Sequence, residues 1–369
     1  MIYLDNAANA PVKDEVLDEF CRVEKTYLGN ANSIHEAGKA SNAFYEECTN
    51  KLLNLLGLDP FVYEVVYTSG ATESNNLAIS GVANAYSGFG DHFLSSEFEH
   101  SSVNAPLSAL KDKGARIDLI KTKENGHIDL DDLKTKLDAQ ALLVTLCAVK
   151  SEVGTLQPIQ EAQKIVNQSN AKLLVDATQA LGKLPVDLNG IDLISFTPHK
   201  FGGIIGTGVL VKKKEIILAP LLRGGKSQSP YRSGTLALGL VASIVKAVEL
   251  ALTEEKENYE KAKVLWSNLH DGLSQIEGVR INSFEGNPYI LNFSYDYAQG
   301  GALVKYLSEK GICISQKSAC SVATLPSKVI NAIYHDKKRA LSSVRVSLWK
   351  ENTKEDIDAL LTALKEFPR

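Results

Sequence analysis

Short apolar runs alternate with helical or turn-like segments between about residues 64 and 213. Strands that alternate with helices form a mostly parallel sheet that helices cover on both faces. In such sheets, ligands bind beyond the carboxyl ends of the strands. The pattern therefore predicts an α/β fold with a mostly parallel seven-stranded sheet, built from the runs at residues 65–67, 93–95, 117–120, 142–145, 173–175, 193–196 and 209–211.

Helical spacing of apolar residues flanks this region on both sides. It predicts helices around residues 16–23 and 44–56, and a long helical stretch that includes residues 244–252 and 265–273. Further apolar runs at 279–281, 290–293, 312–314 and 344–346 indicate a smaller α+β domain. We therefore expect a large domain of residues 12–250 and a small domain made of residues 1–11 and 251–369, joined by the long helix.

Composition is that of an ordinary globular chain. The 369 residues are 44% hydrophobic and 23% charged, and the net charge is -4 without a block of basic residues, so we expect no nucleic-acid or membrane partner. The start of the chain lacks the pattern of a signal peptide. Five cysteines without regular spacing or a CxxC pair favour a reduced cytoplasmic protein without disulfides or a metal site.

Polar clusters follow several of the predicted strands. Small residues in the loop 68–72 suit either a phosphate cradle at a helix start or an ordinary capped turn. Asp176 is either a helix cap or the partner of a buried cation, and Gln179 would point to the same side. Lys200 is either a surface lysine or a carbonyl nucleophile. Asp176 and Lys200 are separated by about one helix and one strand, so two neighbouring strands would place them at one edge.

Two further residues attract attention near the end of the chain. Cys320 lies among small polar residues close to Lys317, which suits an exposed, reactive thiol. Arg345 lies on an alternating strand, where it would bind a substrate carboxylate or form a strand-face ion pair. The other cysteines lie in apolar patterns, and we expect them to be core residues: Cys21, Cys48, Cys147 and Cys313.

Eight segments, in this order, resemble the cysteine desulfurase family, which are class V aminotransferases of pyridoxal-phosphate (PLP) fold type I. The resemblance runs from Tyr3 to about Asp358. The segments are 3–8, 29–35, 68–76, 176–179, 199–200, 232–235, 318–321 and 343–347. Departures from the family pattern are Ser151, where the family has an asparagine, the stretch 225–228, and Asn9-Ala10 in place of two threonines.

The resemblance implies a role for each matching residue toward the cofactor. Lys200 would form the Schiff base with PLP, and Asp176 would keep the ring nitrogen protonated. Gln179 would bind the ring's phenolic oxygen, and His100 would stack on the ring and move protons. The phosphate would be surrounded by Ala71, Thr72, Thr197 and His199, with Thr235 reaching the phosphate of a neighbouring subunit in a homodimer.

The resemblance also implies a reaction. Arg345 would hold the carboxylate of L-cysteine, with Ser151 and Asn30 as further substrate-binding residues. Cys320 would take the sulfur as a persulfide and leave L-alanine. The sulfur would then pass to an acceptor protein for iron–sulfur cluster assembly or tRNA thiolation.

Two other functions stay open at this point. One is a different class V PLP reaction, such as a selenocysteine or cystine lyase or an aminotransferase, which the Ser151 departure motivates. The other is a non-catalytic descendant that binds PLP or serves as a partner protein.

Overall fold

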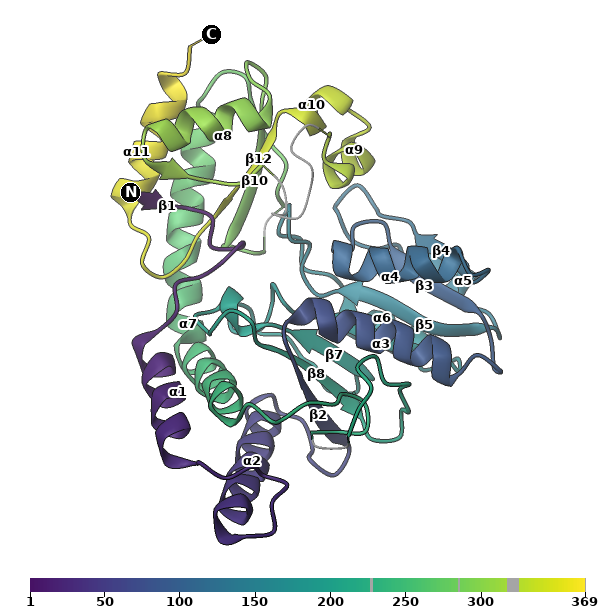
Figure 1. Cartoon of the computed structure of the whole chain (residues 1–369). Coiled ribbons are helices and arrows are strands. Elements are labelled where there is room, and N and C mark those ends of the chain that lie inside the picture. Colours follow the sequence, from purple (N-terminus) through teal and green to yellow (C-terminus); the bar gives the residue numbers. More distant parts are fainter. Residues whose placement is uncertain (226–227, 285, 317–324, 369) are drawn as a thin grey trace.

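The computed structural model describes residues 1–225, 228–284, 286–316 and 325–368 (Figure 1). Its largest sheet has seven strands in the order β2-β8-β7-β6-β5-β3-β4, and β8 runs opposite to both of its neighbours. The mostly parallel sheet predicted from the apolar runs is therefore confirmed. Its strands are β2 (Tyr63–Thr68), β3 (His92–Ser96), β4 (Arg116–Ile120), β5 (Ala141–Cys147), β6 (Lys172–Asp176), β7 (Leu193–Phe196) and β8 (Gly208–Lys213).

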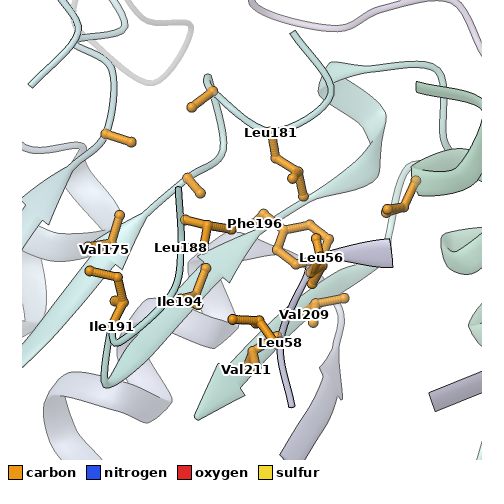
Figure 2. Packing of buried hydrophobic residues seen from close by; sticks show 14 of the residues in the cluster. Leu56, Leu58, Val175, Leu181, Leu188, Ile191, Ile194, Phe196, Val209 and Val211 are labelled. Carbon is orange, nitrogen blue, oxygen red and sulfur yellow. The ribbon is translucent and has the colours of Figure 1, made fainter. Parts of the chain in front are cut away.

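Helices cover both faces of this sheet because strand residues point alternately to the two sides. On one face, Phe93, Leu174 and Leu210 pack against α3 (Ala71–Ala85) and α4 (Ser101–Lys111). On the other face, Val175 and Phe196 belong to a second apolar cluster (Figure 2). The helices of that cluster are α1 (Asp14–Thr26), α2 (Glu36–Leu55), α5 (Leu130–Lys136), α6 (Ile159–Val166) and the first part of α7 (Leu238–Ser274).

A separate apolar cluster surrounds two smaller sheets. The strand β1 (Ile2–Tyr3) pairs in parallel with β11 (Ile312–Cys313), and β10 (Ile290–Tyr295) lies between β9 (Val279–Ile281) and β12 (Ser343–Ser347) in an antiparallel sheet. The cluster is completed by α8 (Gly300–Glu309), α11 (Lys354–Lys365) and the second part of α7. Two short helices, α9 (Lys328–Tyr334) and α10 (Lys337–Leu341), pack beside them.

The helix α7 joins the two apolar clusters. Its 37 residues run without a break from the side of α1 and α2 to the side of β10 and α11 (Figure 1). Val241 and Val248 belong to the cluster at the large sheet, and Leu265 and Leu269 to the cluster at the small sheets. The domain boundary that we place at residue 250 thus falls inside one continuous helix, and the division remains a prediction. In the described residues, we find no helix with the length and apolar character needed to span a bilayer.

Candidate active site

The carboxyl ends of two neighbouring strands bring the predicted acid and amine to one edge. β6 ends at Asp176, which pairs in register with Ser195 of the parallel strand β7. The chain then passes through Thr197 into a single 3₁₀ turn, η1 (Pro198–Lys200), which carries Lys200. The Lys200 Nζ donates a hydrogen bond to the Ala8 carbonyl oxygen at 2.5 Å. The first residues of the chain therefore form part of the same edge.

A cavity of about 390 Å³ opens at this edge of the sheet. Most of the residues predicted from the sequence line it, although they come from the ends of five strands of the large sheet and from β12 of the small sheet. They are Ala71, Thr72, His100, Ser151, Asp176, Gln179, Thr197, His199, Lys200 and Arg345. Backbone and side chains that were not predicted complete the lining, namely Ala7, Ala8, Phe98, Ser102, Cys147, Thr178 and Ile205 among others.

Two predicted residues do not line this cavity in the described part of the chain, and a third lies outside that part. Asn30 and Thr235 are exposed, and within the described part of the chain neither of them lines it. Thr235 instead borders a smaller hollow beside Gln228 and Arg232. Cys320 lies outside the described residues, as do residues 226 and 227 of the stretch that departs from the family pattern. The roles given to Asn30, Thr235 and Cys320 remain predictions.

The first turn of α3 forms the end of the cavity that suits an anion. Gly70 is its N-cap, and among the described side chains none caps this turn, so amide hydrogens there are available to a ligand. The backbone of β8 crosses very close by, since a Cβ added at Gly208 would lie 2.4 Å from the Gly70 backbone. The loop can approach the strand this closely only because residue 208 is glycine.

The Thr197–His199 pair lies at the same end. The Thr197 hydroxyl donates to the Thr207 carbonyl oxygen at 2.7 Å, so it accepts from His199 Nδ1, also at 2.7 Å. Burial, together with the charges of Lys200 and Lys183, lowers the pKa of His199 to about 4. A bound anion would offset these positive charges.

Asp176 and His100, which both line the cavity, are each held by hydrogen bonds. Asp176 is buried and accepts from Asn75 Nδ2 at 2.9 Å and from the Thr178 amide at 3.0 Å. His100 caps α4 and accepts at Nδ1 from the Ser102 amide at 3.1 Å. Burial lowers the pKa of His100 and Lys200 adds to this, against the raising effect of Asp176. The imidazole is therefore kept neutral near pH 7.

Gln179 is oriented by a buried lysine that sequence reasoning missed. Lys183 Nζ donates to Gln179 Oε1 at 3.3 Å, and Gln179 Nε2 donates to the Ala7 carbonyl oxygen at 2.8 Å. Because the Ala7 carbonyl oxygen can only accept, Nε2 must face it, and the amide oxygen therefore faces Lys183. Burial lowers the pKa of Lys183 to about 7, with further contributions from the charges of Lys200 and Arg345.

Arg345 lies at the wall formed by β12. Only 1% of its surface is exposed, and its Nη2 pairs with Asp5 Oδ1 at 2.9 Å while Nη1 donates to the Ser151 carbonyl oxygen at 3.0 Å. Its Nε is buried and has no hydrogen-bond partner among the described residues. Arg345 thus forms an ion pair and also borders the cavity, so the structure is compatible with both alternatives from the sequence, an ion pair on the strand and a ligand for a substrate carboxylate.

Three polar residues of this site were missed from the sequence, and the expectation that Cys21 is a core residue is wrong, because Cys21 is exposed. Asn75, Lys183 and Asp5 support residues of the cavity, and each is a polar residue in or beside an apolar stretch, which was the available signal. Cys147 is buried, as expected, but it lies at the carboxyl end of β5 and borders the cavity. Burial raises its pKa well above that of a free thiol, so it is a poor nucleophile.

These groups together fit PLP. The turn at α3 supplies amide donors for a phosphate, with the Thr197–His199 pair beside it, and Asp176 supplies an acceptor for a protonated ring nitrogen. Lys200 supplies an amine. Two buried polar atoms at the lining, Arg345 Nε and Thr178 Oγ1, have no partner among the described residues, which is expected where a ligand completes the hydrogen bonds.

Comparisons with known proteins point to the same cofactor. The family model described as aminotransferase class V matches residues 2–360. The cysteine desulfurase IscS of Dictyoglomus turgidum is 35% identical over 99% of this chain and 94% of its own, and that of Pectobacterium carotovorum is 34% identical over 99% and 92%. A solved NifS-like protein superimposes with a TM-score of 0.91 at 30% identity, covering 99% of this chain and 98% of its own. The chain therefore belongs to the class V aminotransferase family, whose cofactor is pyridoxal phosphate.

Proposed function

We propose that this protein is a cysteine desulfurase, which converts L-cysteine to L-alanine and carries the sulfur as a persulfide on Cys320. The observation that carries the proposal is the meeting of Asp176, His100, Lys200 and Arg345 at one cavity. The relatives named as cysteine desulfurases, which match nearly the whole chain, support the choice of reaction.

The reaction balances without an external oxidant. The thiolate of Cys320 attacks the sulfur of cysteine, so that a sulfur–sulfur bond forms as the carbon–sulfur bond breaks. The electron pair of the broken bond stays on carbon, which takes up a proton and becomes the methyl group of alanine. The sulfur atoms are oxidised as the carbon is reduced.

Several residues would hold the cofactor. The first turn of α3 with Ala71 and Thr72, together with Thr197 and His199, would bind its phosphate. Asp176 would accept a hydrogen bond from its ring nitrogen, Gln179 would donate to its phenolic oxygen, and Lys200 would attach to it covalently. When bound, PLP supplies an electron sink for the carbon that carries the substrate amine.

The remaining groups act on substrate and protons. Arg345 would bind the carboxylate of cysteine, because its Nε is left without a partner among the described residues while Asp5 fixes the guanidinium plane. Ser151, at the neighbouring wall, would place its hydroxyl beside that carboxylate. His100 is neutral and would hold a proton at Nε2, and the Lys200 amine would move a proton to or from the substrate carbon.

Partners and location form a further part of the proposal. By the family resemblance, two copies would form a homodimer in which Thr235 of each copy reaches the other's phosphate. An acceptor protein would take the sulfur for iron–sulfur cluster assembly or tRNA thiolation. The irregular, odd set of five cysteines supports a reducing, cytoplasmic location.

The decisive experiment incubates the PLP-loaded protein with L-cysteine and measures both alanine and the mass of the Cys320 peptide. We expect alanine to form and this peptide to gain one sulfur atom. Cys320→Ala should lose the persulfide and the turnover but keep the visible absorbance of the bound cofactor. Cys147→Ala serves as the matched control and should keep all three, because the Cys147 thiol is buried and protonated. Undiminished sulfur release by Cys320→Ala would refute the mechanism.

The same preparation decides between the proposal and a different class V reaction. A panel of amino acids, including selenocysteine and cystine, is assayed for keto acids and for released selenium or sulfur. A keto acid formed from any of them, with turnover that survives Cys320→Ala, would replace the desulfurase by a transaminase or lyase. The Lys200→Ala variant gives the background for every assay.

A further inference from the structure

Asn75 is a buried amide behind the cavity wall, at the centre of four elements. It lies on α3, is 0% exposed, and sits among apolar neighbours of the same helix such as Leu77 and Ala78. A fully buried amide is costly unless its polar atoms have partners. Asn75 finds them on β6, on β7 and at the start of α4, in the side chains of Asp176, Ser195 and Ser102.

The orientation of this amide is fixed by its partners. The Asp176 carboxylate can only accept, so the nitrogen of Asn75 faces it, at 2.9 Å from Oδ2. The second hydrogen on Nδ2 is donated to Ser102 Oγ, also at 2.9 Å, and Oδ1 accepts from Ser195 Oγ at 2.5 Å. A flipped amide would place its oxygen against the carboxylate and lose both donated bonds.

Two donors of Ser102 place the proton of His100, and the orientation of Asn75 directs one of them, the hydroxyl. Because Ser102 Oγ accepts from Asn75, its single hydrogen is free to point to His100 Nδ1, at 2.8 Å. The Ser102 amide donates to the same nitrogen at 3.1 Å. A nitrogen that accepts two hydrogen bonds carries no proton, so the proton of the neutral imidazole is on Nε2.

We propose that Asn75 is a positioning residue that holds the carboxylate of Asp176 and, through Ser102, keeps the proton of neutral His100 on Nε2. Through this one amide, Asn75 positions both Asp176, the acceptor for the ring nitrogen, and His100, whose Nε2 would donate toward the reacting groups. Asn75 itself does not touch the cavity within the described residues. The kinetic consequence rests on the proposed function, whereas the proton position and the effect on cofactor binding do not.

The first test reads the proton position directly. In PLP-loaded protein labelled with ¹⁵N-histidine, the signals of His100 are assigned among the seven histidines with a His100→Gln variant. We expect an unprotonated Nδ1 and a protonated Nε2. A protonated Nδ1 in the wild-type protein would overturn the proposal.

The second test separates the two links of Asn75. Asn75→Ala should raise the fraction of His100 with a proton on Nδ1 and weaken PLP binding by on the order of tenfold to a hundredfold, because a hydrogen bond to the Asp176 charge is lost. Ser102→Ala keeps that bond, so it should change the His100 signals and weaken PLP binding much less than Asn75→Ala does. Asn84→Ala, an exposed change on the same helix, is the control and should change neither.

A merely structural role for Asn75 would give a different pattern. The folded Asn75→Ala and Ser102→Ala proteins would then keep the wild-type His100 signals and PLP affinity and lose only thermal stability, which would refute the proposal. If Asn75→Ala does not fold, the Ser102→Ala signals decide alone. With cysteine as substrate, Asn75→Ala should lower kcat and leave KM unchanged. An inactive wild-type protein with the expected His100 signals would refute the proposed function and leave this inference standing.

Discussion

Removing the charge of Lys183 should make the protein more stable at neutral pH and change how its stability depends on pH. The lysine is 1% exposed, donates to Gln179 Oε1, and lies near the charges of Lys200 and Arg345, so burial lowers its pKa from 10.5 to about 7. In the unfolded chain it regains the ordinary pKa. Below about pH 7 the folded protein therefore carries the full cost of a buried charge, and above about pH 10 it carries none.

The magnitude follows from the two pKa values. At about 1.4 kcal/mol for each pH unit, a fall from 10.5 to about 7 corresponds to about 5 kcal/mol. Between these values the unfolded chain binds one proton more than the folded chain, so the free energy of unfolding rises with pH. Lys183→Met keeps the apolar stem and removes the titration. It also loses the hydrogen bond to Gln179, worth about 1 kcal/mol, so we expect a net gain of about 3 kcal/mol at pH 7.

The assay is urea unfolding of the cofactor-free proteins at several pH values. The stability of the wild-type protein should rise by about 3 kcal/mol more than that of Lys183→Met between about pH 7.5 and 9.5. Lys263→Met, an exposed change on α7, should follow the wild-type curve. If the curves of the wild-type protein and Lys183→Met run parallel, Lys183 is charged in the fold and the reasoning from burial fails.

Two other substitutions test close contacts of the site. Gly208→Ala would place a Cβ 2.4 Å from the Gly70 backbone, so we expect a loss of about 3 kcal/mol of stability and weaker PLP binding. Gly88→Ala is the control and should be tolerated, because a Cβ there would have nothing within 4 Å. Equal melting temperatures of the two variants would contradict this expectation. Asp5→Asn leaves the buried Arg345 without its charged partner, so the free energy of unfolding measured in urea should fall by about 3 kcal/mol. If the effect is no larger than that of Asp18→Asn, an exposed change, the ion pair contributes little to stability.

Strands and helices were predictable because each depends on a local pattern. Each of the seven apolar runs is a strand of the large sheet. A strand that is buried on both faces needs a run of apolar residues, and such a run can be recognised in the sequence. The strand β1 was missed because two residues, Ile2 and Tyr3, are too few to show an alternating pattern. Its partner strand lies more than 300 residues away.

Most of the predicted site residues line one cavity for a related reason. Asp176 ends β6 and Lys200 follows β7, and these strands are neighbours both in the chain and in the sheet, so the spacing of the two residues predicted their proximity. Lys183 and Asn75 were missed because a single polar residue in an apolar stretch gives no indication of its partner. The pairing of Asp5 with Arg345 joins positions 340 residues apart, and local periodicity does not report contacts of that range.

That pairing has a consequence for the order in which the protein matures during synthesis. All seven strands of the large sheet have been translated once Lys213 is added, so the strands that carry the proposed cofactor site are synthesised early. Asp5 must wait for Arg345, which at 5 to 20 residues per second emerges roughly 20 to 70 seconds later. With the roles proposed above, a nascent chain could bind PLP well before it can bind the carboxylate of its substrate.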